Sequence, residues 1–414
     1  MKFVILLLFT IAFYLQGNIA GLLGIEKNVV VYLLYFLCII AFILKKDNNR
    51  IKYVSFILIG AVFLLAYRFF SHMFSGSFLT TSFIILPALI IYILPKDWKT
   101  KDNMTLKKKL LSFVYSFYVI ECLIAIIELL TQRYVFGWSE SAYGDGVWRF
   151  TSTDSNFRSV SMCGSPLGNS LRVLTINSFI LFSSLSLQKK VFCYVIGLVS
   201  VFAFNARISI ILFFLSAILY VFKDFRSMRI RKKIRIITGS LLICAFAFVA
   251  IFYFGFGSRI TETNIESDSS IEQRLKLFEY VASASLKDYL WGWPFEDVVA
   301  DMDYIGIVVI ENFWIGFMML LGLIPLIYFT VFYFLLGKDL FNGYPLYNKL
   351  VLFSLFITNA SINNSMYSNY APLMTFLVCI IIFKNDYSNN ISSNSLVSTK
   401  MDELKIDNIN ALNH

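Results

Sequence analysis

The stretch LLSFVYSFYVIECLIAIIELL, residues 110–130, decides the fold class of this chain. Two glutamates are its only charged residues. At a rise of about 1.5 Å per residue, a helix of this length covers about 30 Å, the thickness of the hydrocarbon core of a bilayer. The lysines at 107–109 directly precede it, which is typical of the cytoplasmic flank of a membrane span. We therefore expect residues 110–130 to form a transmembrane helix.

Apolar blocks of similar length recur along the whole chain. A hydrophobic content of 58%, a charged content of 15% and a mean hydropathy of +0.71 exclude an ordinary soluble domain. We predict an all-α integral membrane protein of about 12 transmembrane helices. One polytopic domain would cover residues 1–384, followed by a disordered tail at 385–414 that is rich in Asn and Ser. The spans are expected near residues 3–23, 28–44, 51–70, 78–94, 110–130, 170–187, 191–205, 207–222, 237–256, 310–336, 349–366 and 370–383.

The basic residues orient these spans. The net charge is +10, and most of the 36 Lys and Arg residues stand in short runs beside apolar blocks. Such runs mark cytoplasmic flanks, so both termini are expected in the cytoplasm. The basic cluster between residues 223 and 235 is interpreted as one of these flanks, in contact with anionic lipid. The positive charge is therefore a sign of topology and does not indicate a nucleic-acid partner.

The basic residues assigned to the outer side are mainly arginines, whereas those on the cytoplasmic side are mainly lysines. Topology alone does not require this difference. A guanidinium group binds phosphate through two parallel hydrogen bonds, while lysine is a hydrated point charge. The outer surface is therefore expected to recognise phosphate. The outer basic residues are Lys27, Arg68, Arg133, Arg149, Arg158, Arg172, Arg207, Arg259, Arg274, Lys276 and Lys287.

Two outer, periplasmic loops are expected to be long, at about residues 131–169 and 257–309. Long loops between closely connected spans are often functional. The first loop combines arginines with Gly164, Pro166 and Gly168, a composition that can form a backbone nest for an anion. The second has a helical apolar pattern that predicts a short amphipathic helix at the membrane surface. The apolar residues of that pattern are Ile271, Leu275, Phe278, Ala282 and Leu286.

Charged residues near membrane depth are candidates for chemistry. Arg207 stands between two apolar blocks, where it is either part of a site or extends to the outer headgroups. Glu311 opens the tenth span, where it would be either a general base or a cap of that helix. Glu121 and Glu128 share one helix face, and Arg68 is a plausible structural partner for one of them.

Several other classes of site have no support. Five of the six cysteines lie within apolar blocks, so a single chain has no external disulfide, and no Cys or His spacing suits a metal site. The chain contains no phosphate-binding P-loop, no dinucleotide fingerprint and no nucleophile elbow. A nucleotide-driven or hydrolytic activity is therefore not expected.

The order of these features resembles the superfamily of Wzy-type O-antigen polymerases and O-antigen ligases. The resemblance covers most of the chain as a pattern. Five features carry it: the stretch Arg158–Ser170 with its Gly-Ser-Pro-Leu-Gly core, the turn with Arg207, Arg274 in the second loop, the turn Trp291–Pro294, and Glu311-Asn312 before a span that reaches Gly322–Ile324.

The resemblance implies a membrane glycosyltransferase of the bacterial cytoplasmic (inner) membrane that needs no metal, cofactor or nucleotide sugar. It would polymerise oligosaccharide repeat units linked to undecaprenyl pyrophosphate into O antigen or a capsule at the outer face. Membrane lipid surrounds such an enzyme, and a chain-length regulator would be a further partner. The resemblance assigns catalysis to Glu311 as base, with Arg207 and Arg274, and glycan pyrophosphate binding to Arg158, Arg149, Arg172, Arg259 and Asn312.

One position separates the subclasses of this superfamily. Ligases typically carry a histidine before the asparagine that enters the tenth span, and here that position is Glu311. This favours the polymerase over the ligase. A glycolipid flippase or another transporter is the alternative that is not an enzyme. Transporters usually show internal repeats and charges near the midplane, and neither is evident in this sequence.

Overall fold

The computed structural model describes residues 1–45, 51–71, 77–95, 98, 100–136, 157–223, 230–231, 233–234, 238, 269–307, 310, 312–362, 366 and 369–384. Of residues 27, 51–53, 77–79 and 269–274 it describes only the backbone. Every regular element in the described part of the chain is a helix, so the all-α prediction is confirmed. The predicted tail at 385–414 and most of the ninth predicted span, 237–256, lie outside the described residues.

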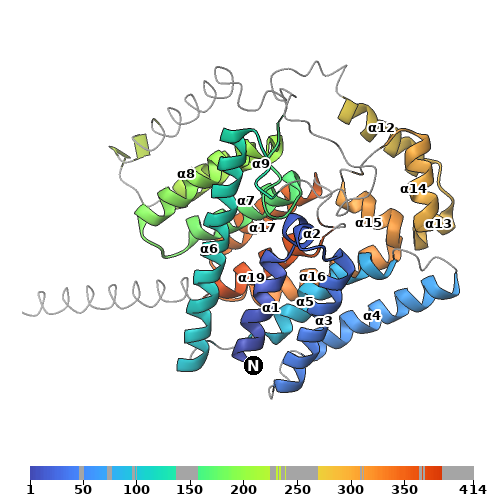
Figure 1. The fold of residues 1–414 in the computed structure, drawn as a ribbon, viewed down its shortest axis with the longest axis horizontal. Coiled ribbons are helices and arrows are strands. Elements are labelled where there is room, and N and C mark those ends of the chain that lie inside the picture. Colours follow the sequence, from blue (N-terminus) through green and yellow to red (C-terminus); the bar gives the residue numbers. More distant parts are fainter. Residues whose placement is uncertain are drawn as a thin grey trace, which may run out of the picture.

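The helices of the N-terminal third follow the predicted apolar blocks closely (Figure 1). The longest of them, α6, contains the stretch that opened the sequence analysis and extends it by several residues toward its N-terminus. Thr100 caps α6 by accepting a hydrogen bond from the Asn103 amide. These helices are α1 (Lys2–Tyr14), α2 (Gly17–Leu22), α3 (Lys27–Leu44), α4 (Ile51–Phe70), α5 (Ser77–Ile93) and α6 (Lys101–Thr131).

The rest of the described chain is also helical, with three short helices grouped together in the second long loop (Figure 1). These helices are α7 (Pro166–Phe182), α8 (Leu187–Ala203), α9 (Arg207–Phe222), α12 (Ser269–Ala282), α13 (Leu286–Trp291), α14 (Phe295–Tyr304), α15 (Phe313–Leu321), α16 (Leu323–Leu340), α17 (Leu346–Ser361) and α19 (Ala371–Phe383).

Two of the predicted spans are broken into two helices, each at a glycine with positive φ. The first span breaks between α1 and α2, where Gly17 has φ +46°. The tenth breaks between α15 and α16, where Gly322 has φ +90°. A Cβ at Gly322 would collide with the backbone of Trp291, and one at Gly17 with the backbone of Cys163. Each break is therefore fixed by a segment far away in the sequence that packs against the glycine.

Two helices form the centre of the molecule. α7 packs against α8, α9, α17 and α19, and α19 also packs against α5 (Figure 1). Nearly every residue of α19 is buried, and the buried side chains of α7 include several polar ones. Both helices are enclosed by their neighbours: α19 is almost entirely apolar, whereas α7 has polar residues such as Asn169, Arg172 and Asn177 buried inside the protein.

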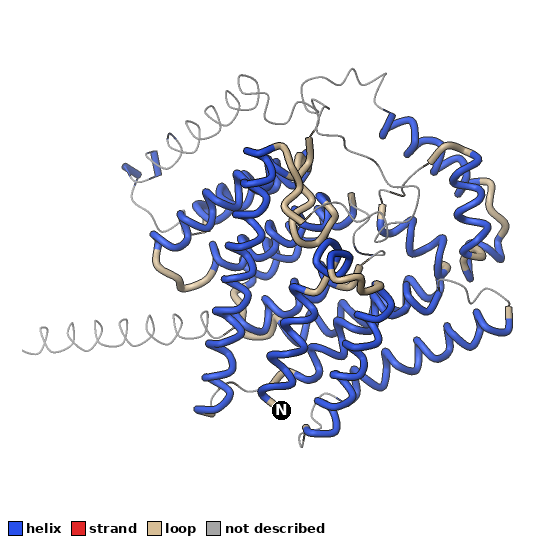
Figure 2. Tube along the Cα trace, viewed as in Figure 1, coloured by secondary structure: helices blue, strands red, loops and turns tan. Residues whose placement is uncertain are grey.

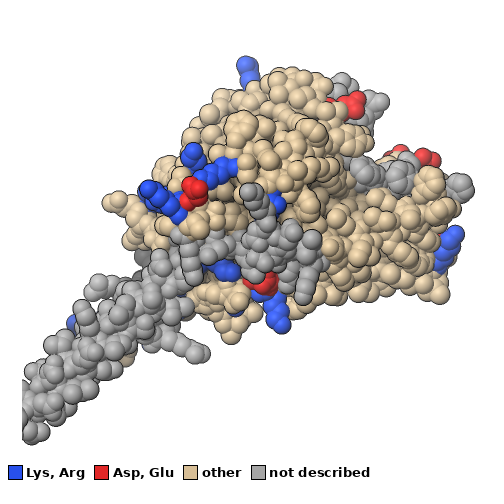
Figure 3. Space-filling model, turned by 90° about the horizontal axis from the view of Figure 1, so that it is seen from below, with Lys and Arg blue, Asp and Glu red and all other residues tan. Residues whose placement is uncertain are grey.

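The remaining helices surround this centre, and they leave many apolar side chains on the outside. α3, α4, α8 and α16 carry exposed Phe, Ile, Leu and Val residues, for example Phe36, Ile59 and Phe334. On the face in Figure 3, charged side chains occupy only small, separate areas. By length and composition, α6 and α16 could cross a membrane, and six shorter helices in the described part are also apolar.

The amphipathic helix predicted in the second loop is present as α12, although its packing differs from the pattern. Leu277 and Val281 face the protein and form a small apolar cluster with Trp293, Val298 and residues of α15. Leu275 and Phe278, which belong to the predicted apolar face, are exposed. α12 therefore has apolar residues on two sides, one of which is covered by the protein.

Candidate functional site

The segment 157–165 is the centre of the candidate site, and it is anchored by a buried carboxylate. One Glu128 oxygen, Oε2, accepts hydrogen bonds from Ser159 Oγ at 2.6 Å, Val160 N at 3.0 Å and Ser161 N at 2.9 Å. The other, Oε1, accepts one from Val135 N at 3.0 Å. Glu128 is 0% exposed. The backbone nest for an anion was predicted at Gly164–Gly168, whereas the amides that bind this glutamate lie elsewhere, and those of Gly164 and Gly168 donate to Val160 O and Ser165 Oγ.

The same segment packs against the turn between α8 and α9. Ser159 N donates to Ala203 O at 2.9 Å, and Arg158 Nε donates to Phe204 O at 3.2 Å. Asn205, with φ +48°, completes the turn, and Arg207 is the first residue of α9. Arg158 and Arg207 are both half-buried. The structure thus brings two of the predicted site residues, far apart in sequence, to a single turn.

On its other side the segment is held by the break between α1 and α2 (Figure 2). Asn18 N donates to Met162 O at 3.2 Å, and the Asn18 side-chain amide donates to Ser161 O at 2.7 Å. The missing side chain of Gly17 leaves room for Cys163. The polar sequence Gln16-Gly17-Asn18 inside an apolar block was the sequence feature that could have identified this contact.

Helix α7 begins directly after the segment. Ser165 caps it by accepting a hydrogen bond from Gly168 N at 3.2 Å, and Pro166 occupies the first turn, where it costs no hydrogen bond. The Asn169 side chain donates to Val160 O at 2.7 Å. The Gly-Ser-Pro-Leu-Gly sequence is therefore explained locally as a helix start that holds the preceding loop in place.

Arg172 was predicted to contact an outer phosphate, and the structure places it in the interior. It lies in the second turn of α7 and is only 2% exposed. Its guanidinium carbon lies 4.3 Å from the ring centroid of Phe117, and Nη1 donates to Cys163 Sγ and, at 3.4 Å, to the Gln16 side chain. Arg172 is therefore buried within α7, which begins at Pro166, and is not exposed on the outer surface as predicted; its role in binding pyrophosphate stays a prediction.

Glu121 lies near Arg172 and differs sharply from Glu128. It is buried on α6, and neither of its oxygens makes a hydrogen bond of ordinary geometry with a described residue. Arg172 acts on it electrostatically, and Nε and Nη2 of Arg172 are likewise without hydrogen bonds in the described part. A buried carboxylate and a buried guanidinium with unused capacity are typical of polar sites that take up water or a ligand.

Arg68 does not pair with either glutamate, contrary to the prediction. It is 0% exposed on α4, and it donates to Trp293 O at 2.8 Å and to Leu320 O. Leu320 belongs to the last turn of α15, where unpaired carbonyls and the helix dipole favour a positive charge. Trp293 N donates to Met319 O at 2.7 Å. Arg68 therefore joins the turn at Trp291–Pro294 to the break at Gly322, two features that the sequence analysis had noted separately.

The entrance of α15 is only partly described. Asn312 is its N-cap, and Oδ1 accepts hydrogen bonds from Trp314 N at 2.9 Å and Ile315 N at 3.2 Å. Trp314 Nε1 donates to Ser361 Oγ at 2.9 Å, which ties this entrance to the end of α17. The Asn312 oxygen thus has a structural role. Other predicted site residues fall outside the described part: Glu311, Arg149 and Arg259 entirely, and the side chain of Arg274, of which only the backbone in α12 is described.

Comparison with known proteins adds no assignment. No protein-family model matches the chain, and no curated protein matches it in sequence. The resemblance to O-antigen polymerases therefore rests on the residues quoted above.

Proposed function

We propose that the chain is embedded in a membrane through about twelve spans, with both termini on the cytoplasmic side. The support is that polar and apolar side chains are distributed in the opposite way to those of a water-soluble protein. Polar and charged residues such as Glu128 and Arg68 are fully buried, while α3, α4 and α16 expose large apolar residues. A water-soluble protein would have to hide these residues, whereas lipid solvates them at no cost.

The hydrogen bonds between helix ends support one common orientation. Lys45, after α3, donates to carbonyls at the end of α5, and Lys190, at the start of α8, donates to Tyr220 near the end of α9 at 3.3 Å. Lys2 and Asp102 form an ion pair at 2.7 Å between the starts of α1 and α6. The helix ends that carry lysines thus meet one another, as the cytoplasmic ends of spans should.

The start of α9, which carries Arg207, also meets other helix ends. Ser209, beside Arg207, donates to Asn359 near the end of α17 at 3.0 Å, and the same end of α17 contacts Trp314 at the entrance of α15. Lys349 lies at the opposite end of α17. The start of α9 with Arg207 therefore lies among helix ends that are remote from Lys349, on the side that we assign to the outer face.

On this basis we infer a membrane glycosyltransferase that joins oligosaccharide repeat units carried on undecaprenyl pyrophosphate, at the outer face of the bacterial inner membrane. The observation that carries the proposal is the convergence of Arg158 and Arg207 on one turn. Two guanidinium groups there would bind the donor pyrophosphate and stabilise the charge that develops on the leaving group. Glu311 would remove the proton from the attacking sugar hydroxyl. Arg149, Arg259 and Arg274 would add further phosphate or glycan contacts.

The test is complementation of a null strain, read on a gel of surface glycan. We expect Arg158→Ala and Arg207→Ala to abolish long polymer without loss of the protein from the membrane. Arg158→Lys and Arg207→Lys should restore only part of the polymer, because an ammonium group lacks the planar fork. The matched control is Arg133→Ala, since Arg133 is exposed and lies outside the segment. Wild-type chain length in both alanine variants would contradict the assignment.

The gel also separates the alternatives. Loss of a polymerase leaves core capped by one repeat unit, loss of a ligase leaves bare core, and loss of a flippase traps the units on the inner side. Glu311→Gln is expected to abolish turnover and to retain donor binding. An unchanged rate in that variant would exclude Glu311 as the base.

A further inference from the structure

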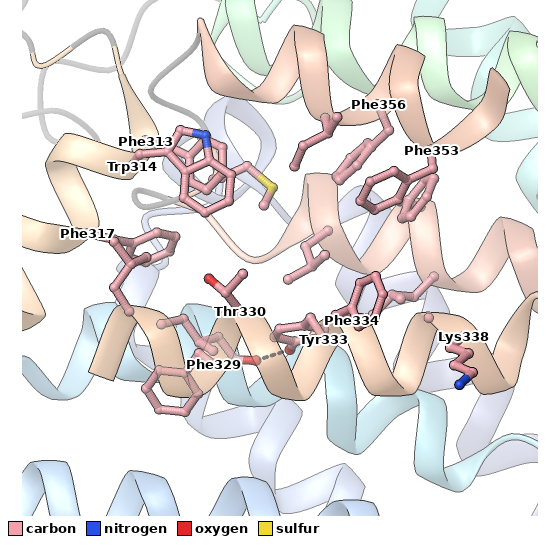
Figure 4. A pocket seen from close by; sticks show the side chains of 18 of the residues that line it. Phe313, Trp314, Phe317, Phe329, Thr330, Tyr333, Phe334, Lys338, Phe353 and Phe356 are labelled. Atoms are coloured by element: carbon pink, nitrogen blue, oxygen red, sulfur yellow. Dashed lines mark hydrogen bonds between the residues drawn. The ribbon is translucent and has the colours of Figure 1, made fainter. Parts of the chain in front are cut away.

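A cavity of about 430 Å³ lies among α5, α15, α16, α17 and α19, away from the segment 157–165 (Figure 4). Its wall is almost entirely aromatic and aliphatic, and Phe313, Trp314 and Phe317 form one end. The Tyr333 hydroxyl, one of the few polar groups in the wall, donates to Ile84 O. The wall therefore has little to offer a polar molecule and suits a hydrocarbon chain.

The other end of the cavity is basic. Lys338, in the last turn of α16, and Lys349, in the first turn of α17, both line it. Neither ammonium group forms an ion pair or hydrogen bond with a described residue, and their neighbour Asp339 is not within ion-pair distance of either. An apolar cavity that ends at two uncompensated ammonium groups is complementary to an amphiphile with an anionic head.

The length of the cavity indicates how much hydrocarbon it holds. Along α16 it extends from Lys338 back to Leu326, which is about 18 Å at a rise of about 1.5 Å per residue. That is slightly more than half of a hydrocarbon core of about 30 Å. The cavity therefore covers at least the depth of a single leaflet from its charged end, at the lysine-bearing side of the protein, and continues from there to Phe313 and Trp314.

We propose that this cavity binds an acyl chain of an anionic phospholipid from the cytoplasmic leaflet, with the phosphate between Lys338 and Lys349. The proposal rests on the membrane embedding proposed above and is independent of the sugar chemistry. The site is separate from that of the donor pyrophosphate. Lys349 and Asn359 are about 15 Å apart along α17, and Asn359 contacts Ser209 at the arginine end.

The chain offers a substitution that fills the cavity without a clash. Gly337 lines it, and a Cβ at this position would meet no atom within 4 Å. Gly337→Leu should therefore occupy the space of the acyl chain in a folded protein, with Gly337→Ala as its small counterpart. The double variant Lys338→Gln, Lys349→Gln removes the positive charge from the site proposed for the lipid phosphate. Lys189→Gln, at an exposed position at the start of α8, is the matched control.

The experiment is native mass spectrometry of the full chain in detergent with dipalmitoyl phosphatidylglycerol, dipalmitoyl phosphatidylcholine or undecaprenyl phosphate. We expect one tightly bound phosphatidylglycerol and weaker binding of phosphatidylcholine. The affinity of the double lysine variant for phosphatidylglycerol should be lower by on the order of tenfold, while its affinity for phosphatidylcholine should be unchanged. Gly337→Leu should weaken both phospholipids, whereas Gly337→Ala and Lys189→Gln should behave like wild type.

Two results would overturn the proposal. One is equal binding of the two phospholipids, or phosphatidylglycerol binding that does not depend on the lysines. The other is displacement of phosphatidylglycerol by undecaprenyl phosphate at equal concentration, which would make a polyprenyl lipid the occupant. The glycan gel distinguishes a failure of this proposal from a failure of the glycosyltransferase proposal. Arg158→Ala should lose polymer and retain the phospholipid, and the double lysine variant should lose the phospholipid and retain long polymer.

Discussion

Replacement of Glu128 should disrupt the structure of the segment 157–165, the centre of the candidate site. Its carboxylate accepts four hydrogen bonds, three of them from backbone amides of the segments that follow α6. Glu128→Gln keeps one acceptor oxygen and places an NH₂ group where the other oxygen was. At least one backbone amide then faces a donor, and the remaining hydrogen bonds no longer go to a charged group.

The size of the effect follows from these contacts. A buried donor without an acceptor costs about 1–3 kcal/mol, and a bond to a charged group is about 1 kcal/mol stronger than one to a neutral group. We therefore expect Glu128→Gln to lower the free energy of unfolding by about 2–5 kcal/mol and Glu128→Ala by more. Ser159→Ala, which removes a single 2.6 Å bond to this charged carboxylate, should cost about 1.5–3 kcal/mol.

The assay is unfolding of the full chain in mixed micelles, with Glu279→Gln at an exposed position on α12 as control. A double-mutant cycle provides the sharper measurement. In the Glu128→Ala background, Ser159→Ala should have almost no further effect, because its partner is already gone. Full additivity of the two substitutions, or a Glu128→Ala variant as stable as the control, would refute the argument that this carboxylate holds the loop.

Three further predictions concern the contacts around the site. Gly17→Ala should destabilise the protein by about 1–3 kcal/mol, since it adds a positive-φ penalty and a collision with the Cys163 backbone, whereas Gly337→Ala in open helical space should be neutral or stabilising. Burial raises the pKa of the Cys163 thiol to about 12, so iodoacetamide at pH 8 should leave it unmodified in the folded protein, as read by peptide mass spectrometry. Arg68→Lys should cost about 1–3 kcal/mol in the same unfolding assay, because one ammonium group does not reproduce the fork that reaches Trp293 O and a second carbonyl; stability equal to wild type would show that charge alone is sufficient there.

The positions of the helices could be predicted because run length alone marks them. α3, α4 and α9 begin and end within a residue of the predicted ranges. The two breaks could not be predicted, since a glycine inside an apolar run is compatible with a continuous helix. What decides each break is a collision with a distant backbone, that of Cys163 at Gly17 and that of Trp291 at Gly322. At Gly322 the sequence gives no local sign of such a contact, whereas at Gly17 the polar neighbours Gln16 and Asn18 do.

The candidate site was predictable in part for a similar reason. Arg158 and Arg207 stood out because charges beside apolar blocks are costly and few. The sequence also predicted an anion nest in the loop after α6, although at its glycines and not at Val160 and Ser161, whose amides bind Glu128. It did not show that Glu128 is the acceptor for these amides, because the choice of acceptor depends on how α6 and the loop pack. The same limit explains why Arg172 was assigned to the surface.

The buried charges explain how so apolar a chain selects one arrangement of helices. In lipid, apolar contacts between helices gain little over contacts with lipid chains, so they specify packing weakly. A buried charge that must find hydrogen bonds is far more selective, because most alternative arrangements leave it unpaired. Glu128 binds the backbone of the loop that carries Arg158, and Arg68 binds carbonyls at the break of the tenth span. Each charge fixes a junction between segments distant in sequence. The position of the loop that carries Arg158 therefore depends on one carboxylate, and loss of that carboxylate should abolish the proposed polymer formation together with the loop's structure.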